Sequence, residues 1–159
     1  MKINGVSFVL LFASSLLLLH PAFAAEPLAS ADTNWGGVSL DLMSVERKGS
    51  VLTVKWAVHN TGDKGVDVSF GLVGEHVTTY VVDEDSGTKY YALTDQEGHL
   101  VASQHIYLGR DTSGISEKVA AGETKRYWAK FPAPPAEVKA VTLFFAETEP
   151  LEETPITDK

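Results

Sequence analysis

The chain has 159 residues, no cysteine and a formal net charge of −8 at pH 7. Without cysteine it has neither disulfides nor thiolate chemistry, so a hydrophobic core must hold the fold together. The acidic balance argues against nucleic acid and anionic membrane surfaces as partners, because both are bound through clustered lysine and arginine.

Residues 1–24 have the pattern of a cleaved signal peptide. Lys2 precedes an apolar run, Val6 to Leu19, and the small-x-small sequence Ala22-Phe23-Ala24 follows as a cleavage site. The run of fourteen residues is shorter than the ~20 needed to cross a bilayer. We therefore expect a periplasmic or secreted protein with no membrane insertion after cleavage. Removing Lys2 leaves 12 basic against 21 acidic residues, a net charge of −9.

The rest of the chain, 135 residues after cleavage, is one domain by length. Residues 25–37 mix small, polar and glycine residues without a period, which predicts a linker. From residue 38 to 146 the pattern is that of β-strands. One strand is predicted by apolar residues that alternate with more polar ones, namely Leu52, Val54, Trp56 and Val58.

Other segments complete an all-β pattern. The apolar positions change phase at Leu42 and Met43, which predicts a β-bulge. Further strands are predicted at 66–72, 77–82, 88–94, 100–108, 123–131 and 138–146. Because no segment has a helical period, we expect an immunoglobulin-like antiparallel β-sandwich of about seven to nine strands over residues 38–146. The acidic, proline-interrupted residues 147–159 predict an edge segment or a partly disordered tail.

Three stretches carry a resemblance to a known group of proteins: YVVDEDSGTKYYALTDQEG from Tyr80, WAKFPAPP from Trp128 and LEETPI from Leu151. Together they resemble a loosely defined family of bacterial exported immunoglobulin-like β-sandwich domains of unknown function, over about residues 35–156. The resemblance implies a fold and an exported location, but no catalytic residues. Some family members are joined to a cell-wall-binding domain; because residues 35–156 resemble the sandwich domain alone, the resemblance does not imply wall anchoring here.

The acidic stretch that begins at Asp83 raises the question of a calcium site. An EF-hand loop starting there would need Gly at its sixth position and Glu at its twelfth, where the chain has Thr88 and Thr94. The Asp, Ser and Gly residues between β-forming residues instead favour a hairpin turn. A looser calcium or small-ligand site remains an alternative if Asp83 and Asp85 meet Asp95 or Glu97 at one end of the domain.

The sequence contains few of the motifs that catalytic or transition-metal sites use. The histidines that follow the predicted signal peptide have none of the short spacings of a metal site; they are His59, His76, His99 and His105. A Gly-x-Ser-x-Gly elbow and a cysteine nucleophile are both absent from the sequence. The pair Glu152 and Glu153 lies in the tail, where a glycosidase cleft is not expected. We therefore expect no enzymatic activity, no cofactor and no metal centre.

One strand offers a binding surface. If Tyr127, Ala129 and Phe131 point inward, then Arg126, Trp128 and Lys130 share the outer face as a basic-aromatic stripe. An exposed tryptophan between cations suits a sugar ring or an anionic partner, although the Arg and Lys stems could instead simply cover the indole. We expect a non-enzymatic binding or accessory module that contacts a protein or cell-envelope partner. The alternative is a small-ligand or calcium-binding protein that uses the acidic loops, and a subunit that assembles through an edge strand is a third.

Overall fold

The structure is a computed structural model that describes residues 26–109 and 111–159. The predicted signal peptide, residues 1–24, lies outside these residues. The described chain is all β, with twelve strands and no helix: β1 (Ala29–Asp32), β2 (Val38–Lys48), β3 (Val51–Asn60), β4 (Val66–Gly74), β5 (Tyr80–Asp83), β6 (Thr88–Tyr90), β7 (Ile106–Gly109), β8 (Thr112–Val119), β9 (Thr124–Pro132), β10 (Ala140–Phe144), β11 (Leu151–Pro155) and β12 (Thr157–Asp158). Within this part of the chain, no helix could span a membrane.

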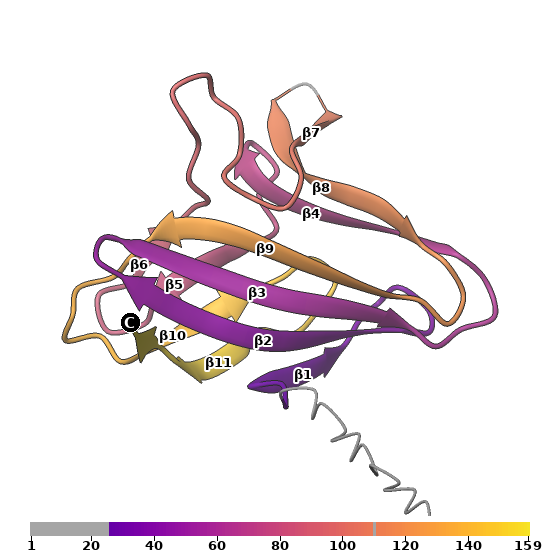
Figure 1. Ribbon diagram of the computed structural model, residues 1–159, viewed down its shortest axis with the longest axis horizontal. Coiled ribbons are helices and arrows are strands. Elements are labelled where there is room, and N and C mark those ends of the chain that lie inside the picture. The colour runs from indigo at the N-terminus through magenta and orange to yellow at the C-terminus, as the bar shows by residue number, and fades with distance from the viewer. Residues whose placement is uncertain (1–25, 110) are drawn as a thin grey trace, which may run out of the picture.

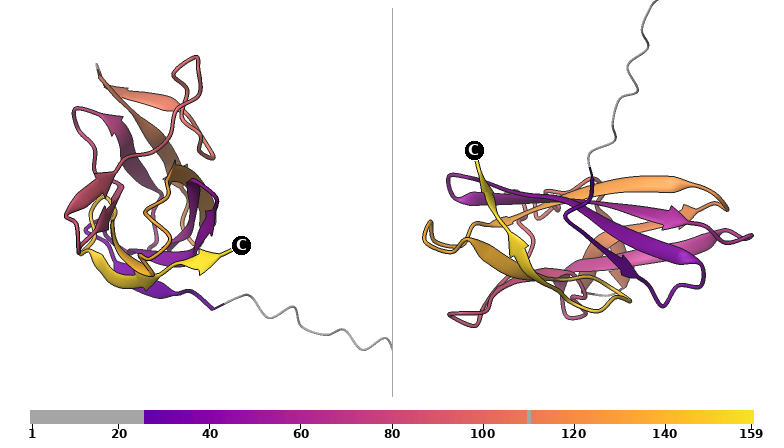
Figure 2. Two further views of the ribbon diagram at one scale, coloured as in Figure 1. Left: turned by 90° about the vertical axis from the view of Figure 1, so that its left-hand side faces the viewer. Right: turned by 90° about the horizontal axis from the view of Figure 1, so that it is seen from below.

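The strands form three sheets. The first has the order β1-β2-β3-β9, with β12 also paired to β2; the second is β11-β10-β5-β6 and the third β4-β8-β7. The β2-β3-β9 layer lies in front of the second sheet in Figure 1, and the β7–β8 hairpin projects away from both. An end-on view shows the strands wrapped around the interior (Figure 2, left). All pairs are antiparallel except β12 with β2.

Two connections between the first and third sheets meet at Asn60. The chain leaves β3 for β4 after Asn60 and returns from β8 to β9 through residues 120–123. The buried Asn60 Nδ2 donates to the carbonyls of Lys64 (2.7 Å) and Val119 (3.0 Å). Its backbone N–H donates to Glu123 (3.0 Å), and its carbonyl accepts from Gly122 (2.8 Å). One residue therefore holds both connections together.

The core is built from the inward faces of these strands. Leu52, Val54, Trp56 and Val58 are all buried, as their alternation predicts. Trp56 lies at the centre of an aromatic cluster, with ring centroids 5.4 Å from Phe70, 5.9 Å from Tyr127 and 5.2 Å from Phe145. Edge-to-face and tilted contacts of this kind add to the free energy gained from burial.

The β-bulge predicted at Leu42 and Met43 is confirmed. Leu42 pairs with Trp56, whereas Ser44 pairs with Lys55, so Met43 is the extra residue of β2. On either side of it, Leu40, Leu42 and Val45 are buried, although Val45 lies an odd number of residues from the first two. The bulge thus keeps apolar side chains on the inner face after the sequence changes phase.

Both ends of the described chain form strands at sheet edges. Within residues 25–37, where a linker was predicted, Ala29–Asp32 forms β1 and pairs with residues 39–42 of β2. Within residues 147–159, where an edge segment or a tail was predicted, β11 and β12 pair with β10 and β2, and Leu151, Thr154 and Ile156 are buried. Both segments join sheet edges, because β2 and β10 present unpaired backbone groups there. These strands, together with β8 (Thr112–Val119) where no strand was predicted, account for the twelve strands of the described residues.

The buried side chain of Arg47 ties β2 to the proline-rich connection between β9 and β10. Its Nε and Nη2 donate to the Asp158 carboxylate at 2.6 and 3.1 Å. The remaining donors reach backbone carbonyls, those of Pro135 (2.7 Å), Val138 (3.0 Å), Ala136 (3.2 Å) and Pro134 (3.3 Å). The planar guanidinium supplies partners for carbonyls that no strand in this connection satisfies.

We predict that Arg47→Met lowers the free energy of unfolding by about 2–4 kcal/mol, because buried carbonyls lose their donors. Urea denaturation of the two proteins measures the difference. The control is Lys55→Met, whose ion pair with Glu46 is 3.3 Å long and half exposed, with an expected loss below about 1 kcal/mol. Equal losses in the two variants would contradict the role of Arg47.

The stability of the fold at low pH gives a second measurement of the contact between Arg47 and Asp158. Hydrogen bonds from Arg47 and Lys139 lower the pKa of Asp158 to about 2. A lowered carboxyl pKa stabilises the fold above the unfolded-state pKa, which is about 3.9, and this contribution disappears as the pH falls towards 2. Over this pH range, the free energy of unfolding of Asp158→Asn should therefore fall less than that of the wild type, as urea denaturation at each pH measures.

Candidate functional site

The outer face of β9 carries the three predicted binding residues. Tyr127, Ala129 and Phe131 are buried beneath β9, whereas Arg126 and Trp128 are exposed and Lys130 is half-buried. Trp128 is 37% exposed. The side chains therefore lie as the alternation predicts. Their role in binding stays a prediction.

Polar residues of β3 lie opposite two of the three residues of this stripe. In the register of β3 and β9, Lys55 lies opposite Trp128, and Thr53 lies opposite Lys130. Next to them, the His59 ring lies 2.8 Å from both Thr124 Oγ1 and Asp41 Oδ2. Ser30 Oγ donates to Asp41 Oδ1 at 2.6 Å, which extends this chain of hydrogen bonds across all four strands of the β1-β2-β3-β9 order.

Two cations of the stripe have no partner within the described residues. Lys55 forms an ion pair with Glu46, but no hydrogen bond or ion pair joins the side chain of Arg126 or Lys130 to another described residue. These two charges flank an exposed indole ring. Their free donors are available to an anionic ligand.

The backbone edge of β9 is already occupied. Residues 93–103 run beside it: Leu93 N–H donates to the Lys130 carbonyl (2.7 Å), and Lys130 N–H donates to Val101 (3.0 Å). Further along, Ser103 N–H donates to the Trp128 carbonyl at 2.9 Å. A partner strand therefore cannot add at this part of β9, because its hydrogen-bonding groups are used. Only side chains remain for recognition.

The acidic stretch at Asp83 forms the hairpin that the sequence predicts. Strands β5 and β6 pair antiparallel, with Asp83 opposite Thr88, and Gly87 in the turn has a φ of 67°. Asp83 is only 4% exposed, and its carboxylate accepts from Asp85 N–H (3.2 Å) and Ser86 Oγ (2.6 Å). These contacts use the carboxylate as a turn cap.

An acidic groove of about 640 Å³ lies beside this hairpin. Its walls come from the β5–β6 turn, β10, the residues before β10, and β11; its acidic residues are Asp83, Glu84, Asp85, Glu137, Glu152 and Glu153. Lys139 is the basic residue of the lining. The sequence could not place Glu152 and Glu153 here, because the contact depends on the pairing of β11 with β10.

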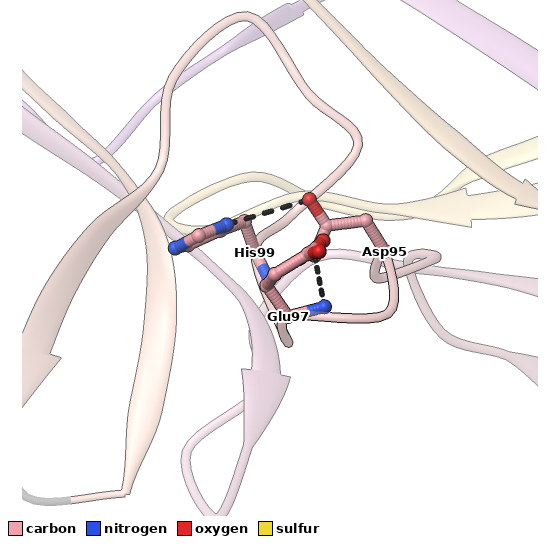
Figure 3. Close-up of side chains that lie close together, drawn as sticks. All are labelled: Asp95, Glu97 and His99. Carbon is pink, nitrogen blue, oxygen red and sulfur yellow. Dashed lines mark hydrogen bonds and ion pairs between the residues drawn. The ribbon is translucent and has the colours of Figure 1, made fainter.

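A second acidic group, separate from the groove, lies in the turn after Thr94. Ligand atoms of Asp95, Glu97 and His99 lie within 4.8 Å of one another, and all three residues are exposed (Figure 3). The Asp95 carboxylate accepts from His99 N–H (2.7 Å) and Glu97 N–H (3.0 Å), and the His99 hydrogen bond is the largest cause of its lowered pKa. Asp95 and Glu97 do not line the groove, so the structure does not join the two acidic loops into one site.

The sequence did not predict two groups of aromatic contacts. Tyr80 stacks on Phe144 with ring centroids 4.6 Å apart, and Lys89 Nζ lies 4.8 Å from the Tyr80 ring centroid. His105 forms edge-to-face contacts with His99 at 5.2 Å and with Tyr107 at 5.1 Å. The first grouping depends on the pairing of β5 with β10, and the second on a loop conformation. Neither leaves a local signal in the sequence.

Comparison with known proteins adds no assignment: no protein-family model, curated protein or solved structure matches this chain.

We predict that Trp128→Ala lowers the free energy of unfolding by about 1 kcal/mol or less, because the ring lies at the surface of the sheet. Phe131→Ala, on the same strand but facing inward and 1% exposed, should cost about 3–5 kcal/mol. Urea denaturation measures both values. A loss for Trp128→Ala as large as that for Phe131→Ala would identify Trp128 as a core residue instead of a surface anchor.

Proposed function

We propose that the protein is an exported, non-enzymatic binding or accessory module that contacts a protein or cell-envelope partner through the stripe Arg126, Trp128 and Lys130. The single observation that carries this proposal is an exposed indole between two cations that have no partner within the described residues. Tryptophan and arginine are frequent anchors of binding surfaces. The stripe lies on a sheet whose core side is well packed, so binding need not disturb the fold.

The proposal extends to the fold and the location. The packing of the strands around the aromatic core at Trp56 supports an immunoglobulin-like β-sandwich, and so does the resemblance described above. The pattern of residues 1–24 supports export to the periplasm or beyond the cell. In such a location a rigid domain without a cysteine would depend on its core and on contacts like that of Arg47.

The hydroxyl, imidazole and carboxylate of Thr124, His59 and Asp41 are arranged in the order of a catalytic relay. A relay also needs hydrogen-bond donors placed around the reacting oxygen and a site that excludes water. These three side chains lie on the outer face of a sheet, and each hydrogen bond joins neighbouring strands. We assign them the role of linking the strands that present the stripe.

In-cell crosslinking of the tagged protein in its native envelope, followed by mass spectrometry, tests the module proposal. We expect a specific envelope component to be enriched, and this enrichment to fall at least tenfold with Trp128→Ala. The control is Tyr107→Ala, which removes a ring that is 75% exposed and lies on β7, outside the stripe. Equal enrichment by the wild type and by Trp128→Ala would overturn the proposed binding face.

The second candidate function is binding of calcium or a small cationic ligand in the acidic groove. The observation that favours it is the convergence of the Asp83–Asp85 turn with Glu137 and Glu152 around one groove. Calcium accepts six to eight oxygen ligands, and carboxylates from separate loops can supply them. The buried Asp83 would orient the turn, whereas its exposed neighbours would face the ion.

For this candidate we predict a rise in melting temperature on addition of calcium. A ligand present at about 100 times its dissociation constant stabilises the folded state by about 2.7 kcal/mol. Thermal unfolding with calcium and with excess chelator measures the shift, and Glu137→Gln with Glu152→Gln should abolish it. The control is Glu97→Gln, outside the groove. An unchanged melting temperature at millimolar calcium would rule calcium out as the ligand of the groove.

A further inference from the structure

The occupied edge of β9 restricts what the stripe can recognise. Because residues 93–103 use the backbone groups beside Trp128 and Lys130, a partner meets the side chains alone. Arg126 and Lys130 offer charge-assisted hydrogen bonds, and Trp128 offers a flat apolar ring. The ligand must therefore supply anionic groups on both sides of a surface that can stack on an indole.

The spacing along the strand sets the scale of that ligand. Residues two apart on one face of a strand lie roughly 6.6 Å apart, so the stripe spans about 13 Å from Arg126 to Lys130. A linear ligand lying along β9 would place its anionic groups about this far apart, with a stacking ring between them. A chain of sugars that carries a carboxylate on each ring has both features.

The composition of the face favours such a chain over a protein partner. Stable protein interfaces bury about 800 Å² on each side around an apolar centre. Among the described residues, Trp128 is the one large apolar side chain that is exposed on the outer face of β2, β3 and β9. Lys55, which lies opposite it, is charged. The acids of this face are occupied, because Asp41 contacts His59 and Glu46 contacts Lys55. Within the described residues, the two cations on either side of Trp128 keep their charges free of ion pairs.

We propose that the stripe binds a linear carboxylated polysaccharide, with one pyranose ring on Trp128 and carboxylates of the neighbouring sugars paired with Arg126 and Lys130. The inference rests on the proposed function, because it names the partner class of the same face. The apolar C–H face of a pyranose contacts the indole, as flat apolar surfaces do on aromatic rings. The pairs with Arg126 and Lys130 form at the protein surface, so affinity falls with added salt.

Polygalacturonate oligomers are the probe, titrated into the mature protein at low salt by calorimetry and by tryptophan emission. Trp56 is buried and Trp35 is partly buried against Phe70, so comparison with Trp128→Phe at saturating oligomer assigns a change in emission to the ring of Trp128. We expect Trp128→Ala and the double variant Arg126→Gln, Lys130→Gln each to weaken binding at least tenfold. Trp128→Phe should retain part of the affinity, and the methyl-esterified oligomer should bind at least tenfold more weakly.

The matched control is Lys118→Gln, an exposed lysine of β8 in a different sheet, which should bind within twofold of the wild type. Binding of polyglutamate as tight as that of polygalacturonate, and insensitive to Trp128→Ala, would overturn the inference in favour of charge alone. Absence of polygalacturonate binding at millimolar concentration would overturn it as well. If crosslinking in the envelope still depended on Trp128 in that case, the proposed module would stand and only the glycan assignment would fall.

Discussion

The side-chain amide of Asn60 is the constraint on which the rest of the arrangement depends. It is 1% exposed, and it bonds to carbonyls on both chain connections that join the first sheet to the third. A buried amide without partners would be costly, so its hydrogen bonds favour one relative position of the β3–β4 and β8–β9 connections. The backbone of Asn60 bonds to Gly122 and Glu123, which continues the register of β3 with β9. The register in turn places Trp128 opposite Lys55 and leaves Arg126 opposite Ala57, which carries no charge.

Which charged side chains remain available on a given face depends on their local ion pairs and hydrogen bonds more than on the net charge of the protein. On the outer face of the first sheet, Lys159 and Lys55 hydrogen-bond to Glu46 and lower its pKa. Asp41 is bound by His59 and Ser30. Glu46 and Asp41, the carboxylates on β2, therefore already have cationic or hydrogen-bonding partners. An acidic protein can in this way present free cations on one face, while unpaired acids gather around the groove at the β5–β6 turn.

The sequence predicted the features that depend on neighbouring residues. The inward and outward sets of β9, the bulge at Met43 and the hairpin after Asp83 all follow from alternation or turn composition, and the structure agrees. Features that depend on distant pairing could not be predicted. Arg47 and Asp158 are 111 residues apart, and nothing near Arg47 indicates a buried guanidinium. The groove likewise required the pairing of β11 with β10, which brings Glu152 towards Asp83.

The covered edge of β9 connects stability with recognition. An open edge strand would expose unpaired N–H and C=O groups to other chains, which is a route to aggregation. Residues 93–103 fill these positions with backbone hydrogen bonds from the same chain. Because that segment occupies the edge and not the face, it leaves Trp128 exposed to solvent. Recognition through this face then depends on side chains that contribute little to the packing of the core. Such side chains can be substituted without loss of the fold.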